Sequence, residues 1–136
     1  MKKISFALKA AEAYGVNPAI ILDYIAFFCW ANHRKRMSII DGKIWTYASV
    51  RHISQSFPFF TDRQIRTAIV HLIRKGAIVT GEYNQKGYDK TKWYSPTADG
   101  WLNCSFDLNV RPYDKNVKPI PVDNIIETEV RNFQEI

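Results

Sequence analysis

The sequence predicts a small α+β protein that is mainly α-helical. One stretch, residues 61–76, carries the start signal, the apolar periodicity and the stop signal of a single amphipathic helix. The residues that follow form two strand-like runs separated by a turn-rich loop. A chain of 136 residues, of which 46% are hydrophobic, is about one domain long and can form one core.

The helix of residues 61–76 is the element that the sequence specifies best. Thr61 is a favourable N-cap, and Gln64 three residues later completes a capping box. Gly76 is the residue expected just after the last helical turn. Apolar side chains recur at positions i, i+3, i+4, i+7 and i+8, which predicts one buried stripe: Ile65, Ala68, Ile69, Leu72 and Ile73.

The opposite face of this helix is polar and basic. Its centre and flanks carry the following side chains: Arg63, Gln64, Arg66, Thr67, Val70, His71 and Arg74. A charged outer face is most often simply solvated, but such a face can also meet a DNA duplex. The helix alone leaves both interpretations open.

Two helices are expected at the N-terminus. The first covers about residues 6–14 and ends at Gly15. The second begins with Asn17 as N-cap and Pro18 at the first helical position, and it extends to about Asn32. Because this second helix is apolar on nearly all sides, we expect it to be buried.

Two short elements are expected between these helices and the helix of residues 61–76. The turn residues Asp41 and Gly42 predict a small β-hairpin, or one strand entered from a turn, within residues 39–48. Ser49 is then a suitable N-cap for a short helix that Pro58 terminates. This helix and the next one form a helix-turn-helix.

Strand-like residues 77–83, a loop of residues 84–90 and strand-like residues 91–95 follow the helix-turn-helix. Helix, helix, strand, basic loop and strand is the order of a winged helix. The sequence therefore predicts a winged helix-turn-helix with an N-terminal helical extension over residues 1–100.

Residues 101–136 are expected to form an extended C-terminal arm or short linker. Three X-Pro pairs exclude a long regular element there, and only residues 122–133 are suited to a last helix. The arm carries four Lys or Arg against six Asp or Glu. We expect it to pack on the domain, to serve as a linker or to bind a protein partner.

The basic charge is concentrated in the middle of the chain. The formal net charge is +6, and residues 31–92 contain twelve Lys or Arg against four Asp or Glu. This distribution suits a polyanionic partner. The basic run of residues 33–36 is explained equally well by a favourable helix C-terminus and by contacts with phosphate.

The sequence gives no indication of a catalytic, metal or membrane site. Cys29 and Cys104 lack metal-ligand spacing, which is typical of reduced, buried thiols in the cytoplasm. The three histidines have no metal spacing either, and no nucleophile motif or phosphate-binding glycine loop is present. The most apolar run is too short for a membrane span. We therefore expect a soluble cytoplasmic protein that is not an enzyme and holds no cofactor.

Several core and turn motifs carry a resemblance to a known family. They are Trp45, which is expected in the core, Phe57-Pro58-Phe59, Gln64-Ile65-Arg66, the close from Leu72 to Gly76, and Lys92-Trp93-Tyr94. Over residues 18–98 the chain resembles the winged-helix domain at the N-terminus of phage and plasmid replication proteins of the replisome-organiser or DnaD-like kind. The resemblance implies binding of DNA at a replication origin or scaffolding of a helicase-loading complex. Those proteins usually continue into a second domain, so this sequence is either a fragment or a small protein that uses the fold differently.

The leading hypothesis is a DNA-binding winged helix, phage or plasmid encoded, that acts in replication initiation or its regulation. In it the second helix of the pair reads base edges of double-stranded DNA, and the wing lysines contact phosphates. The candidate DNA-binding residues are Arg51, Arg63, Gln64, Arg66, Thr67, Arg74, Lys86, Tyr88, Lys90 and Lys92. The alternative is a small protein-interaction module, a phage adaptor or an inhibitor of a host protein, that presents aromatic residues or the acidic arm to its partner.

Overall fold

The computed structural model describes residues 3–88 and 90–108. The elements, in chain order, are α1 (Leu8–Tyr14), α2 (Val16–Arg34), β1 (Ile39–Ile40), β2 (Lys43–Ile44), β3 (Thr46–Tyr47), α3 (Val50–Ser56), α4 (Asp62–Arg74), β4 (Ile78–Gly81), β5 (Trp93–Pro96) and α5 (Ala98–Asn103). The expected α+β class with more helix than strand is confirmed.

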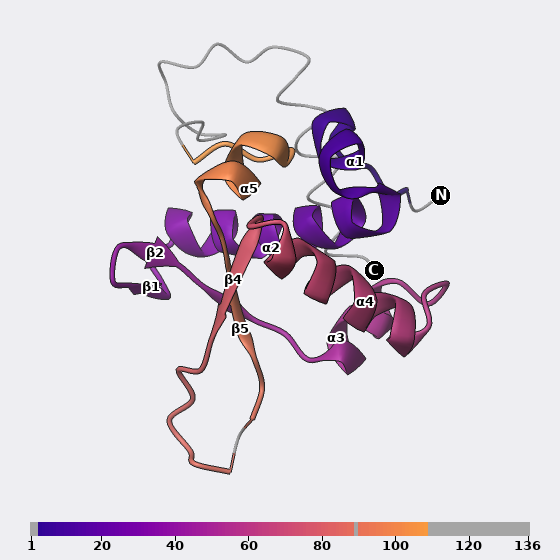
Figure 1. Ribbon diagram of the computed structural model, residues 1–136. Coiled ribbons are helices and arrows are strands. Elements are labelled where there is room, and N and C mark those ends of the chain that lie inside the picture. Colours follow the sequence, from indigo (N-terminus) through magenta and orange to yellow (C-terminus); the bar gives the residue numbers. More distant parts are fainter. Residues whose placement is uncertain (1–2, 89, 109–136) are drawn as a thin grey trace.

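Helix α2 forms the centre of the domain. It is buried along most of its length and packs against α1, α4 and the sheet. In Figure 1 it crosses the middle of the domain, with α1 and α5 on one side and the β4–β5 hairpin extending to the other. The burial follows from the sequence, because a helix that is apolar on all sides is stable only when other elements surround it.

The start of α2 differs from the expectation. Asn17 is not the N-cap, because the helix already begins at Val16 and Gly15 is its cap residue. Gly15 has φ +95, which separates α1 from α2, and its carbonyl oxygen accepts a hydrogen bond from the Ala19 N–H at 3.0 Å. Pro18 consequently lies within the first turn, where its missing N–H leaves no hydrogen bond unmade.

The two helices of the predicted helix-turn-helix begin with the expected caps. The Ser49 hydroxyl accepts from the His52 N–H at 3.1 Å and starts α3. For α4, the Thr61 hydroxyl accepts from the Gln64 N–H at 3.1 Å. The Gln64 side-chain oxygen in turn accepts from the Thr61 N–H at 2.9 Å, so the capping box is complete.

The apolar stripe of α4 is buried except for its last member. Ile65, Ala68, Ile69 and Leu72 belong to the core, whereas Ile73 is 38% exposed, so its expected burial was wrong. At 100° per residue, Ile73 lies about 90° from the middle of the other four positions. The stripe therefore ends at Leu72.

Two small antiparallel sheets lie beside the helices. Strands β1 and β2 form the expected hairpin, and its turn residues Asp41 and Gly42 both have positive φ, at 52° and 74°. This is the combination that a tight two-residue hairpin turn requires. The second sheet has the order β3-β5-β4, so β3 pairs with the last strand of the chain and not with its neighbour β2.

The packed domain continues past residue 100, where the arm was expected to begin. Helix α5 ends at Asn103, and Phe106 is buried with its ring centroid 5.7 Å from those of Phe27 and Trp30. The buried carboxylate of Asp23 accepts from the Ser105 backbone N–H at 2.9 Å and also from the Ser105 hydroxyl. The remainder of the predicted arm, with its possible helix at 122–133, lies outside the described residues.

Candidate nucleic-acid interface

The outer face of α4 presents the predicted polar side chains to solvent. Arg63, Gln64, Arg66, Thr67 and Arg74 are all exposed. Between the last of them lies Val70, which is 44% exposed although it is apolar. The capping box at the start of the helix and the positive φ of Gly76 after its end fix the length of this face.

Gln64 has a structural role that limits its use as a base reader. A glutamine that pairs with adenine uses both its amide oxygen and its amide nitrogen. Here the oxygen accepts the hydrogen bond from the Thr61 N–H, so only the nitrogen is available. The structure therefore assigns Gln64 to the start of α4 and leaves base reading to the exposed residues beyond it.

Two hollows border α4 and distinguish its two flanks. One, of about 430 Å³, lies between α4 and the junction of α1 with α2, and its lining includes Tyr14, Asn17, Arg63 and Thr67. The other, of about 330 Å³, is lined by α4 residues alone: Arg66, Thr67, Val70, His71 and Arg74. The N-terminal helices thus flank α4 on one side, and the open side carries Arg66, Val70 and Arg74.

The β4–β5 hairpin projects from the body of the domain and carries the remaining basic residues (Figure 1). Lys86 and Lys90 are exposed in its loop. Tyr88 is 78% exposed, and the Lys86 Nζ lies 5.8 Å from its ring centroid, which is a cation–π distance. These side chains extend the basic surface beyond α4.

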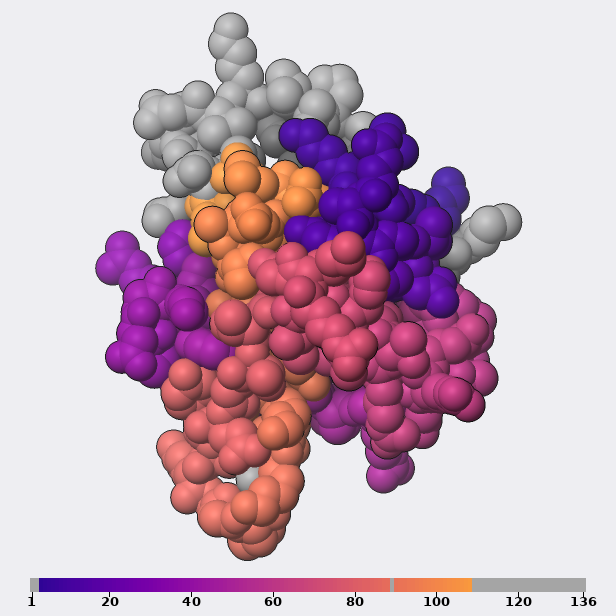
Figure 2. All heavy atoms as spheres, in the orientation of Figure 1, coloured from indigo at the N-terminus to yellow at the C-terminus, as the bar shows by residue number. Residues whose placement is uncertain are grey.

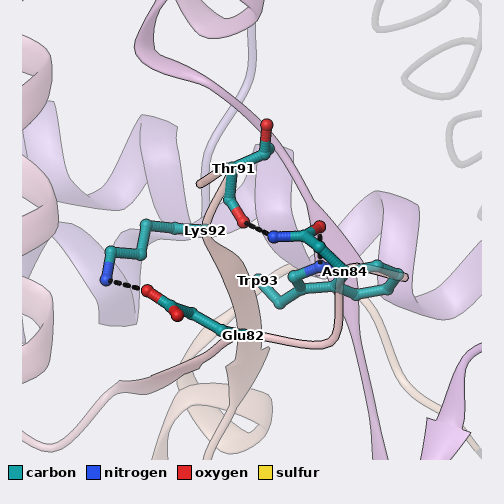
Figure 3. A network of polar contacts seen from close by, with 5 residues as sticks. All are labelled: Glu82, Asn84, Thr91, Lys92 and Trp93. Carbon is teal, nitrogen blue, oxygen red and sulfur yellow. Dashed lines mark hydrogen bonds and ion pairs between the residues drawn. The ribbon is translucent and has the colours of Figure 1, made fainter. Parts of the chain in front are cut away.

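Lys92 is exposed but is not a free cation. Its Nζ lies 2.9 Å from the Oε1 of Glu82, and both side chains are 53% exposed (Figure 3). The hydrogen bond from Lys92 and its charge hold the pKa of Glu82 below the usual value. The pair is therefore ionised and electrically neutral at pH 7, so the prediction of Lys92 as an independent phosphate contact needs correction.

A second set of contacts fixes the base of the hairpin (Figure 3). The Asn84 side-chain nitrogen donates to the Thr91 carbonyl oxygen at 2.8 Å. The Asn84 side-chain oxygen accepts from the Trp93 indole N–H at 2.9 Å. One asparagine thus joins the two ends of the loop, so the lysines extend from a fixed base.

Arg51 and the basic run of residues 33–36 occupy different places. Arg51 is exposed on α3, which packs against α4, so it adds to the same basic region. The end of α2 lies beside the β1–β2 hairpin, across the β4–β5 hairpin from α4 (Figure 1). There the Arg34 guanidinium lies 5.0 Å from the Trp30 ring centroid, a cation–π contact that supports the packing explanation for this residue.

Sequence reasoning missed an aromatic row on the β3-β5-β4 sheet. The ring centroids are 4.8 Å apart for Trp45 and Tyr83, 6.0 Å for Tyr83 and Trp93, and 4.9 Å for Tyr47 and Trp93. The spacing of Trp45 and Tyr47 in one strand-like segment was visible in the sequence. The pairing that places them beside Trp93 was not, because it joins residues that are far apart in the chain.

The two cysteines are buried thiols. Burial raises the pKa of Cys29, and it raises the pKa of Cys104 to about 12. Both thiols are therefore protonated at neutral pH, a state in which they are poor nucleophiles and poor metal ligands. Within residues 3–88 and 90–108, no three His, Cys, Asp or Glu side chains are grouped so as to hold a metal ion.

Comparison of the chain with protein-family models, curated proteins and solved structures gives no match. In the part of the chain that the structure describes, no helix combines the length and the apolar character needed to cross a bilayer.

Proposed function

We propose that this protein is a DNA-binding winged helix in which α4 is the recognition helix and the β4–β5 hairpin is the wing. The observation that carries the proposal is the exposed face of α4, with Arg66, Val70 and Arg74 on its open side. The element order supports it as well, since α3, α4, β4 and β5 follow one another and β3 adds a third strand to the sheet. In Figure 2, α4 and the hairpin lie on the same visible face of the molecule.

The dimensions and chemistry of α4 suit a major groove. A groove about 12 Å wide admits an α-helix, and the 13 residues of α4 extend for about 20 Å. Arg66 is placed to bond bidentately to guanine, and an exposed apolar side chain such as Val70 can contact the thymine methyl group. This use accounts for an apolar residue on the outer face of an otherwise polar stretch.

The residues around α4 are suited to phosphate contacts. Lys86 and Lys90 on the wing and Arg51 on α3 are exposed cations that can neutralise phosphates without reading a base. Arg74, at the end of α4, is placed for the same task. These contacts would set the affinity for any duplex, while Arg66 and Val70 would set the preference for a sequence.

The proposed biological setting is replication initiation, or its regulation, in a phage or plasmid. It rests on the resemblance of residues 18–98 to winged helices of replication proteins. In such a role the domain acts in the cytoplasm as a binding module without catalysis.

The test compares Arg66→Ala with Lys9→Ala by fluorescence anisotropy. Lys9 is exposed on α1, so its removal changes the net charge equally without changing α4. On a duplex selected from random sequences, Arg66→Ala should cost about 1 to 3 kcal/mol, and on scrambled DNA it should cost much less. Lys9→Ala should match the parent on both.

Absence of binding by the parent protein to either duplex at low salt would refute the proposal. The basic face of α4 would then be a solvated surface or a protein-binding one.

A further inference from the structure

The aromatic row lies on the outer face of the β3-β5-β4 sheet. Trp93 is directly opposite Tyr47 on one side and Gly81 on the other, so these positions share a face. The opposite face carries Tyr94, which is buried in the core together with Ile78. The row therefore lies on the side of the sheet that does not face the helices.

The rings in this row differ in accessibility and are held in place. Trp45 is buried, Tyr83 and Trp93 are half-buried, and Tyr47 is 57% exposed. The Trp93 indole N–H is bonded to Asn84, which prevents free rotation of the ring. A Cβ on Gly81 would lie 2.8 Å from the Tyr83 ring and 3.2 Å from Trp45, so only glycine lets these rings lie over the strand.

The charge beside the row is positive. Lys86 is three residues after Tyr83, and Lys90 is three residues before Trp93. Three residues of extended chain span at most about 11 Å, so each lysine Cα lies within that distance of an aromatic residue in the row. An accessible ring beside lysines favours a ligand that combines flat apolar groups with negative charge, and single-stranded DNA combines both.

We propose that Tyr47 and Trp93 form a platform on which one unpaired DNA base stacks, while Lys86 and Lys90 contact the neighbouring phosphates. A base inside a duplex is stacked on its neighbours and cannot reach a protein ring, so the platform requires an unpaired strand. The protein should therefore prefer a duplex with a single-stranded end to the same duplex with blunt ends. This preference rests on the proposed function, because α4 holds the paired part.

The experiment measures anisotropy with three probes, namely a blunt duplex, the same duplex with a short thymine overhang, and a thymine oligomer alone. The parent protein should bind the tailed duplex about 5-fold or more tightly than the blunt one, as expected for one stacked base. Tyr47→Ala should abolish this preference without changing affinity for the blunt duplex, whereas Tyr47→Phe should keep it. Phe59→Ala is the matched control, since Phe59 is 58% exposed and lies outside the sheet. It should keep the preference as well.

Tyr47→Leu, which keeps an apolar side chain but removes the ring, provides a second variant if Tyr47→Ala does not fold. Equal binding of blunt and tailed duplexes by the parent would overturn the stacking platform and leave the role of α4 intact. Binding of the oligomer that depends on Tyr47, without any duplex binding, would support the platform and refute the proposed function. Absence of binding to all three probes would overturn both.

Discussion

The ion pair between Glu82 and Lys92 gives a quantitative prediction about DNA binding. The two side-chain atoms are 2.9 Å apart, so Lys92 must leave the carboxylate before it can neutralise a phosphate, and Glu82 repels the same phosphate. Glu82→Gln keeps the shape of the side chain and removes its charge. Lys92 is then free to make one additional phosphate contact.

The size of the effect follows from counterion release. One additional phosphate contact steepens the slope of log affinity against log salt by about 0.9. From about 200 mM to about 50 mM salt, the affinity of the variant should therefore rise about 3-fold more than that of the parent. Lys92→Ala should lower the slope by about 0.9 in the Glu82→Gln background and by much less in the parent.

The assay is a salt titration of anisotropy with one duplex. Glu12→Gln is the control, because it makes the same charge change on the exposed surface of α1. Two results would refute the reasoning. One is an equal gain from Glu12→Gln, and the other is a full loss of slope from Lys92→Ala in the parent protein.

Three further predictions concern stability and reactivity. Leu72→Ala should lower the free energy of unfolding by about 2 to 5 kcal/mol, and Ile73→Ala should lower it clearly less, because Ile73 is 38% exposed. Equal melting curves for the two variants would show that the α4 stripe is misplaced. A chain ending at residue 108 should unfold cooperatively, and Phe106→Ala within it should cost about 3 to 5 kcal/mol in denaturant titration. A truncated chain without a transition would show that residues beyond 108 are needed. Alkylation of native Cys104 should be slow at pH 7 and accelerate as the pH rises toward its pKa of about 12, while the unfolded chain reacts quickly. Fast labelling of the native protein would contradict the burial of this thiol.

The sequence by itself determined the elements whose contacts are local. The capping box joins Thr61 to Gln64, and the hairpin turn depends on Asp41 and Gly42, so each requires only residues within a few positions of one another. The polar face of α4 follows from helical periodicity in the same way. These features fix the part of the candidate interface that α4 contributes.

The tertiary structure decided the features that depend on distant pairing. Asp23 meets Ser105, and Tyr47 lies opposite Trp93, in each case across a long stretch of chain. Local sequence does not specify such pairs, because strand register and packing are set by the whole core. For the same reason the sequence did not show that the domain continues to Phe106, that Glu82 neutralises Lys92, or that four aromatic rings share one face of the sheet.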